Sequence, residues 1–161
     1  MTTTESLGGS AAAWLVVLRR YLPFVVLANL AWEALHLPLY SIWDEGSPHE
    51  LAFAVVHCTG GDALIATAAL VLALLLVGSG WPSDRAAYRR VAALTLAIGI
   101  GYALFSEWLN IVVRKAWAYS DLMPVVPGID AGLSPILQWI VIPLAGFGWA
   151  RRGLVQLVSK T

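Results

Sequence analysis

The chain has 161 residues, of which 59% are hydrophobic and only 12% are charged, and its mean hydropathy is +0.74. A soluble domain of ordinary composition would be about 25% charged, so this composition excludes a typical water-soluble protein and indicates one integral membrane domain, residues 1–161. The net charge is zero and the only cysteine is Cys58, which excludes a nucleic-acid partner, an internal disulfide and Cys-x-x-Cys redox chemistry.

The first predicted membrane span covers residues 21–43 and follows a cytoplasmic tail, residues 1–20. Residues 11–18 are apolar, but a span takes about 20 residues, so we expect only a short interfacial segment there. Pro23 lies where the predicted helix starts, and its missing N–H is harmless at that position. Pro38 is expected to kink or end the helix near its outer end.

The second and third spans are expected at residues 51–77 and 91–113. The connection before the second span is short and polar, so the first two spans must be antiparallel neighbours. Ser83, in the next loop, is the candidate N-cap of the helix that leads into the third span. Gly99 and Gly101 would let a neighbouring helix approach the third span closely.

The segment at residues 114–134 is too apolar for a free loop and too rich in proline and glycine for a span. We expect it to fold back over the outer end of the bundle, at the membrane interface or dipping into it. Ser134 followed by Pro135 is typical of a helix start, and it predicts a fourth span over residues 135–150. The expected fold is therefore all-α, an antiparallel up-down bundle of four transmembrane helices.

Lysine and arginine are distributed unevenly between the two ends of these spans. Because cytoplasmic segments are enriched in Lys and Arg, the bias predicts that both termini are cytoplasmic, in a bacterial-type inner membrane. The outer end carries two of these residues, Arg114 and Lys115, and the cytoplasmic end carries eight: Arg19, Arg20, Arg85, Arg89, Arg90, Arg151, Arg152 and Lys160.

Polar side chains interrupt all four predicted spans at a similar depth, in the outer half. Glu33, for example, lies about 18 Å from the cytoplasmic start of its span. Ionisable groups are costly inside a membrane, so the cluster is a functional-site hypothesis. Its members are Asn29, Trp32, Glu33, His36, His57, Asp62, Glu107, Asn110, Arg114 and Gln138.

Helical spacing places many of these side chains on common faces. His57 and Asp62 are the exception, since residues five apart lie about 140° apart on an ideal helix. A local distortion at Gly60-Gly61 would be needed to bring them together. The two predicted stripes are Asn29, Glu33, His36 and Tyr40 in the first span, and Glu107, Asn110 and Arg114 in the third.

One interpretation of the cluster is a buried hydrogen-bond network that holds the helices together. Glu33, Asp62 and Glu107 would pair with histidines, with Arg114 or with aromatic donors such as Trp32, or one of the three acids would be protonated, since burial raises the pKa of a carboxyl group. The same site is a candidate for a lipophilic small molecule. The residues expected to contact such a ligand are Asn29, Trp32, Asn110, Arg114 and Gln138.

A second interpretation is a metal site. Glu33-x-x-His36 puts two ligands on one helix face, as in carboxylate-rich metal bundles. His57 and Glu107, with Asp62 as a further ligand, would complete a mixed nitrogen and oxygen set suited to mononuclear zinc, iron or manganese. A dinuclear site is disfavoured because there is no second Glu-x-x-His motif, and no haem motif supports His36 and His57 as axial ligands.

A third interpretation is an enzyme that transfers protons to or from a lipid-soluble substrate. Glu33 or Glu107 would be the acid or base and His57 its partner, while residues 114–134 would form a lid that excludes water. Membrane lipids are the expected surroundings, and Gly99 and Gly101 are equally compatible with a homo-oligomer or a membrane complex. A buried polar site, structural or ligand-binding, ranks above the enzyme.

Overall fold

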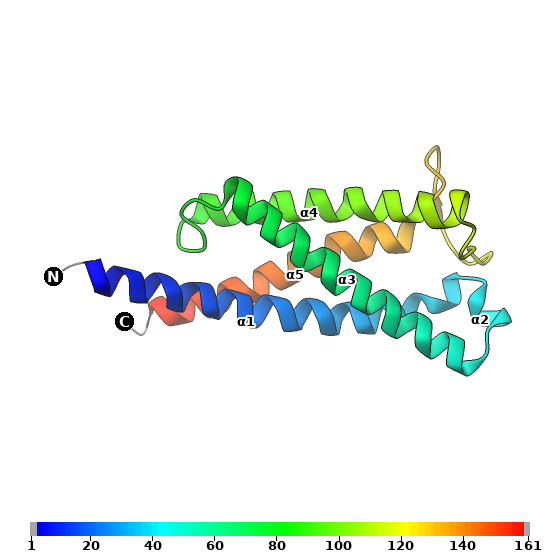
Figure 1. The fold of residues 1–161 in the computed structure, drawn as a ribbon, viewed down its shortest axis with the longest axis horizontal. Helices are drawn as coiled ribbons and strands as arrows, with labels where there is room; N and C mark the ends of the chain where they lie inside the picture. Colours follow the sequence, from blue (N-terminus) through cyan, green and yellow to red (C-terminus); the bar gives the residue numbers. More distant parts are fainter. Residues whose placement is uncertain (1–2, 160–161) are drawn as a thin grey trace.

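The computed structural model describes residues 3–159, with the side chains of residues 11–156 and 159. In this part of the chain, four helices are long and apolar enough to cross a membrane, which confirms the helical, multi-pass architecture. Successive long helices run in opposite directions, and the start of α1 and the end of α5 lie at the same end of the bundle (Figure 1). The four segments are Ala11–Leu39, Pro48–Val77, Arg85–Val113 and Leu133–Gln156.

The first helix is longer than expected. α1 (Thr3–His36) is continuous, so the expected break between residues 11–18 and the span is wrong, and residues 3–10 of the expected tail are helical. The helix continues through Arg20, which is a good helix former, and the Arg20 guanidinium lies 4.5 Å from the ring centroid of Trp149, a cation–π distance. Pro23 is interior to α1, as transmembrane helices tolerate when neighbouring helices pack around them.

Pro38 acts as expected at the other end of this helix. α1 ends at His36, and the 3-10 turn η1 (Leu37–Leu39) and the short α2 (Ile42–Glu45) follow it. A proline cannot continue the backbone hydrogen-bond ladder. The chain therefore turns at the end of the bundle opposite the termini and enters the second long helix.

The second long helix, α3 (Pro48–Val77), begins three residues before the predicted span. Its start is fixed by a capping box, in which Glu50 accepts from the N–H of Ser47 at 2.8 Å and Ser47 accepts from the N–H of Glu50 at 3.4 Å. α3 is a regular helix through Gly60-Gly61, so the distortion considered for bringing His57 to Asp62 does not occur.

The third long helix comprises α4 (Arg85–Glu107) and a π-helical continuation, η2 (Trp108–Val113). Its N-cap is Asp84 and not Ser83. The Asp84 carboxylate accepts from the backbone N–H groups of Ala86 and Ala87, at 3.0 and 3.1 Å. A carboxylate has two oxygens and satisfies both of these donors, which a single hydroxyl oxygen does less well.

The Asp84 cap predicts a specific pH dependence. Its hydrogen bonds to two backbone N–H groups hold the pKa of this fully exposed carboxylate below the ordinary value of 3.8. The cap therefore contributes fully above that value, and its contribution is lost as the pH falls through the lowered pKa. Asp84→Asn keeps a capping oxygen but has no group that titrates. As the pH falls from neutral to acid, we therefore expect the melting temperature of this variant to fall less than that of the wild type. Parallel pH dependences of the two melting temperatures would contradict this.

The last long helix, α5 (Leu133–Val158), starts two residues before the predicted span 135–150 and ends eight residues after it. Before it, β1 (Val125–Val126) and β2 (Ala131–Gly132) form a small antiparallel hairpin. The segment 114–132 lies at the end of the bundle opposite the termini. There it hydrogen-bonds to the turn after α1, from the Ser41 N–H to the Ala118 carbonyl at 2.9 Å and from the Ser120 N–H to the Leu39 carbonyl at 3.0 Å.

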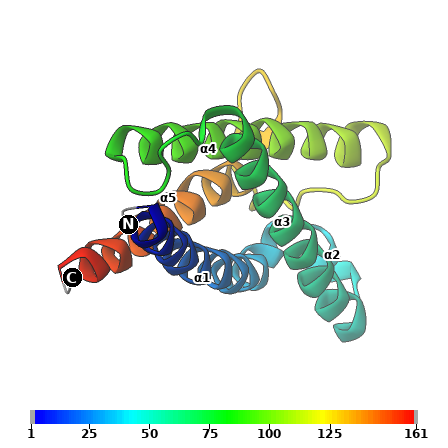
Figure 2. The same ribbon diagram turned by 60° about the vertical axis from the view of Figure 1, so that its left-hand side comes forward.

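The core is tight at the end with the termini and open at the other end. α3 packs its C-terminal half into the core through Ala66, Ala69, Leu70 and Ala73, but only Thr59 is buried in its N-terminal half. The two views of the ribbon show the cause, since α3 diverges from α4 towards its N-terminus (Figures 1 and 2). The polar residues lie where the helices diverge.

Candidate functional site

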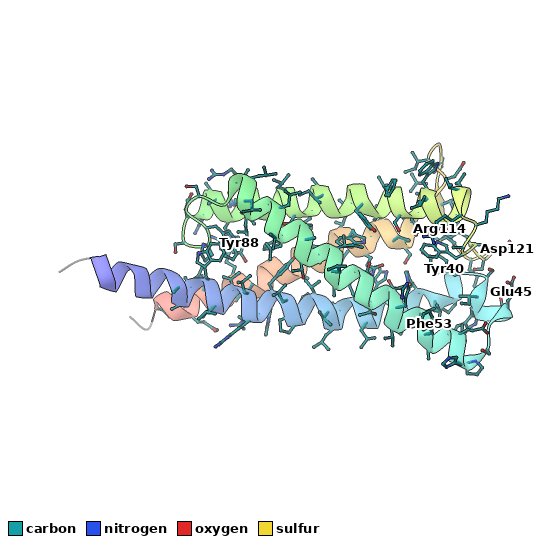
Figure 3. The ribbon with its side chains drawn as sticks, in the orientation of Figure 1. Tyr40, Glu45, Phe53, Tyr88, Arg114 and Asp121 are labelled. Carbon is teal, nitrogen blue, oxygen red and sulfur yellow. The ribbon has the colours of Figure 1, made fainter. Side chains whose placement is uncertain are left out.

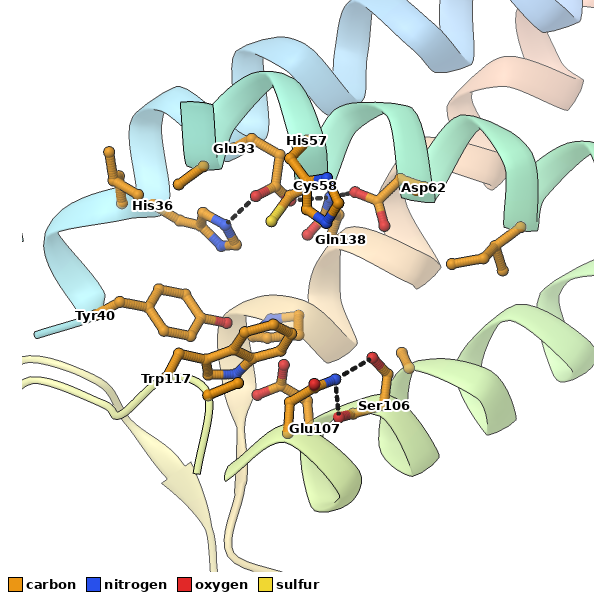
Figure 4. Close-up of a pocket in the computed structure, with 18 of the residues that line it drawn as sticks. Glu33, His36, Tyr40, His57, Cys58, Asp62, Ser106, Glu107, Trp117 and Gln138 are labelled. Atoms are coloured by element: carbon orange, nitrogen blue, oxygen red, sulfur yellow. Dashed lines mark hydrogen bonds and ion pairs between the residues drawn. The ribbon is translucent and has the colours of Figure 1, made fainter. Parts of the chain in front are cut away.

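A cavity of about 370 Å³ lies in the open half of the bundle, between α1, α3, α4 and α5 (Figure 4). Its walls combine apolar side chains with polar groups from all four long helices, and Trp117 of the outer segment also lines it. This volume is within the range of small-molecule sites, roughly 300–1,000 Å³. The predicted cluster members that line it are Glu33, His36, His57, Asp62, Glu107, Asn110, Arg114 and Gln138.

Gln138 of α5 is at the centre of the polar network. Its Nε2 lies 2.9 Å from Asn29 Oδ1, 2.9 Å from Glu33 Oε1 and 2.8 Å from Asp62 Oδ2. The network therefore joins α1, α3 and α5 through one side chain that is buried. A side-chain amide has two hydrogens, so these three acceptors cannot all receive a full hydrogen bond from it.

A second chain of hydrogen bonds converges on Glu33 from the other side. The Trp32 indole donates to Ser134 Oγ at 3.2 Å, and Ser134 Oγ lies 3.0 Å from His36 Nδ1. His36 Nε2 is 3.1 Å from Glu33 Oε2. All these groups are satisfied if Ser134 donates to Nδ1 and Nε2 carries the hydrogen that points to Glu33. The chain orients the Glu33 carboxylate beside the cavity.

Two predicted partnerships are wrong. Trp32 donates to Ser134 and not to Glu33. Ser134 was expected to cap the last helix, but its hydroxyl is used by Trp32 and His36. The helix instead begins at Leu133, whose N–H donates to the Pro124 carbonyl at 2.7 Å, so the serine side chain is free to serve the site.

Glu107, on the opposite wall, is held by the outer segment. The Tyr119 hydroxyl donates to Glu107 Oε2 and accepts from the Gly132 N–H at 2.7 Å. Burial, and then the Glu107 carboxylate, raise the pKa of Tyr119, so the phenol keeps its proton and remains a donor. Arg114 is exposed and makes no ion pair within the described side chains, so the expected Arg114–Glu107 pair is wrong.

Tyr119→Phe is expected to loosen the outer segment. The substitution leaves the Gly132 N–H without its acceptor and removes one donor from Glu107, and such a loss is worth about 1–3 kcal/mol locally. We predict hydrogen exchange of the Gly132 amide to be about tenfold faster or more in native conditions. Tyr102→Phe is the control, because Tyr102 is exposed and its hydroxyl makes no hydrogen bond among the described residues. Equal exchange rates in both variants would show that Tyr119 does not hold the segment.

Two further groups bring hydrogen-bond donors to the cavity. The Tyr40 hydroxyl points into it (Figure 4), and burial together with Glu107 raises the pKa of Tyr40, so that it also stays protonated. The Trp117 indole lines the cavity, and its Nε1 is buried without a partner among the described residues. A buried N–H without an acceptor is costly, which makes Trp117 a group that a ligand would satisfy.

The cavity is open to the surface between α3 and α4. His57, Gly61 and Tyr102 line it and are exposed. A Cβ added at Gly61 would meet no atom within 4 Å. His57 stacks on Phe53, with ring centroids 5.2 Å apart, and makes no hydrogen bond to a described carboxylate. His57 therefore lies at the rim, and its expected partnership with Glu107 is wrong.

The ligand set proposed for a metal does not converge. Within the described residues, no three His, Cys, Asp or Glu side chains lie as a metal ion would require. Glu33 and His36 bind each other, Glu107 binds Tyr119 and His57 stacks on Phe53. The residues present therefore do not fit a mononuclear zinc, iron or manganese site in this arrangement.

Sequence reasoning overlooked three residues of the site: Tyr40 as a donor into the cavity, Tyr119 as the partner of Glu107, and Trp117 in the wall. Tyrosine and tryptophan near the ends of membrane spans usually lie at the membrane interface, so Tyr40 and Trp117 carry no separate signal of a site by residue type. A local signal was present only for Tyr40, which continues the stripe of Asn29, Glu33 and His36. Searches against protein-family models, curated proteins and solved structures give no match for this chain.

Proposed function

We propose that this multi-pass membrane protein binds a small lipid-soluble molecule, with at least one hydroxyl group, in the cavity between α1, α3, α4 and α5. The observation that carries the proposal is the shortage of donors around Gln138. One amide faces three acceptors, and two of these, Glu33 and Asp62, line the cavity. A ligand hydroxyl beside them would supply the missing hydrogen.

The remaining polar groups of the cavity favour the same ligand chemistry. Glu107 accepts from Tyr119 on Oε2, and its carboxylate lines the cavity. The buried Trp117 Nε1 needs an acceptor. A hydroxyl group both donates and accepts, so one or two hydroxyls on an apolar body match the carboxylates and the indole together. The apolar walls suit the remainder of such a molecule.

The direction of entry follows from the membrane position. We assign the end with both termini to the cytoplasm, because seven of the nine Lys and Arg residues that the structure describes lie at that end. The cavity then lies in the outer half of the bilayer, under the segment 114–132. The two helices beside its opening, α3 and α4, carry exposed apolar side chains such as Val56 and Phe105, so a ligand would enter sideways from the lipid.

The test compares two neighbouring glycines. Gly61 lines the cavity and Gly60 does not, and a Cβ at either meets no atom within 4 Å. Gly61→Leu should therefore fill the cavity while Gly60→Leu only adds a lipid-facing side chain. Native mass spectrometry of protein released from its membrane should show a bound small molecule in the wild type and Gly60→Leu, and none in Gly61→Leu. The same spectra for all three proteins would contradict the proposal.

A second candidate function is acid–base catalysis on the bound hydroxyl compound. It is favoured by the chain from Trp32 through Ser134 and His36, which fixes the Glu33 carboxylate at the cavity wall. In this case Glu33→Gln would retain the bound molecule but abolish its conversion, whereas Glu50→Gln, in the exposed capping box, would leave conversion unchanged. A ligand that is recovered chemically unchanged would favour binding alone.

A further inference from the structure

A second hollow of about 370 Å³ lies at the opposite end of the bundle, where α4 begins and α5 ends. Its apolar side is formed by Pro82, Leu154 and Val155, and two arginines also line it, Arg85 of α4 and Arg151 of α5. Tyr88, which marks this end of the molecule in Figure 3, lies between the two helices. This hollow shares no residue with the cavity described above.

Arg151 is held in position at this hollow. The Tyr88 hydroxyl donates to the Phe147 carbonyl at 2.7 Å, which fixes the ring against α5. The Arg151 guanidinium lies 5.5 Å from the centroid of that ring, a cation–π distance. An arginine fixed on a buried aromatic ring loses less freedom when it binds an anion than a free surface side chain does.

Neither arginine is neutralised by a carboxylate. Across the side chains that the structure describes, the one ion pair is His36–Glu33. Asp84, the acidic residue next to Arg85, is engaged with the N–H groups of Ala86 and Ala87. Two unpaired guanidinium groups beside an apolar wall form a site for an anion that is attached to an apolar body.

We propose that this hollow binds the phosphate group of an anionic phospholipid. Arginine forks match phosphate oxygens, and the two guanidinium groups lie on different helices, so that one phosphate would bridge α4 and α5. The exposed Val155, together with Leu154, continues the apolar surface along α5, where an acyl chain would pack. A free phosphate ion would gain nothing from that apolar wall, which is why the site favours a lipid.

The test is a titration of the purified, full-length protein with phosphatidylglycerol, followed by native mass spectrometry. The wild type should bind one phosphatidylglycerol saturably, and phosphatidylcholine much more weakly. The Arg85→Gln/Arg151→Gln double variant should bind phosphatidylglycerol about thirtyfold more weakly. The matched control is Arg89→Gln/Arg152→Gln, which makes the same charge change on the same two helices at exposed positions outside the hollow; it should change the affinity less than about threefold.

Three results would overturn this proposal. Equal weakening in both double variants would mean that only the diffuse positive charge attracts lipid. Displacement of phosphatidylglycerol by inorganic phosphate would mean that the site recognises the free anion. If the glutamine variants do not fold, Arg85→Lys/Arg151→Lys keeps the charge but removes both forks, and unchanged affinity for phosphatidylglycerol in that variant, once folded, is the third. None of these outcomes bears on the cavity at the other end of the bundle.

Discussion

Gln138→Leu is expected to lower the free energy of unfolding by about 2–3 kcal/mol. Leucine has a similar volume, so packing is nearly conserved, but Asn29, Glu33 and Asp62 lose the donor that they share. Leaving buried acceptors without a partner costs more than the hydrogen bonds themselves contribute. The measurement is reversible unfolding in mixed detergent micelles.

Gln156→Leu is the matched control for Gln138→Leu. Gln156 lies on the same helix, α5, and its side chain is exposed. The same substitution there should change the free energy of unfolding by less than about 0.5 kcal/mol. If both variants were destabilised equally, Gln138 would not be the centre of a stabilising network, and the acceptors around it would have other donors.

Gly99→Ala should destabilise the protein by about 1–3 kcal/mol, although alanine is the better helix former. A Cβ at Gly99 would collide with the buried Trp139 ring of α5. Trp139 also lines the cavity, so the contact sets both the spacing of α4 and α5 and the shape of the site. Unfolding in the same mixed micelles measures the effect.

Gly101→Ala, two residues further on, has the opposite expectation. A Cβ at Gly101 would meet no atom within 4 Å, so the substitution should leave the free energy of unfolding unchanged or raise it by up to about 1 kcal/mol. A loss of stability at Gly101 equal to that at Gly99 would mean that helix α4 packs against another surface there, such as a second copy of the chain.

The arrangement of the long helices follows from features that are visible in the sequence. The four long helices are predictable from hydropathy. A segment apolar enough to cross a membrane must satisfy its own backbone hydrogen bonds there, and a helix does so. Pro38 and Gly99 have the predicted effects, because α1 ends just before Pro38 and Gly99 leaves room for the Trp139 ring. The face shared by Asn29, Glu33 and His36 was likewise predictable, since helical spacing alone determines it.

The partners within the site were not predictable from spacing. Ser134 precedes a proline, a pattern typical of a helix N-cap. A serine hydroxyl can either cap the helix or bind another side chain. Here Trp32 and His36 of α1 lie within reach of it, and their position is not visible in the local sequence. Tyr119 reaches Glu107 across a connection whose path is set by the hairpin of β1 and β2. His57 lies at the rim of the cavity, stacked on Phe53 and not bonded to a carboxylate, and helical spacing alone does not show which partner a rim residue takes.

The most direct test of the central claim is to locate a bound ligand. The probe is a long-chain alcohol that carries a photoactivatable diazirine, added to the protein in lipid bilayers, with labelled peptides identified by mass spectrometry. We expect labels on the cavity walls, in the stretches 54–62 and 102–117, and their loss in Gly61→Leu but not in Gly60→Leu. Labels spread evenly over lipid-facing positions such as Leu64 and Leu75, and unaffected by Gly61→Leu, would contradict a ligand site between these helices.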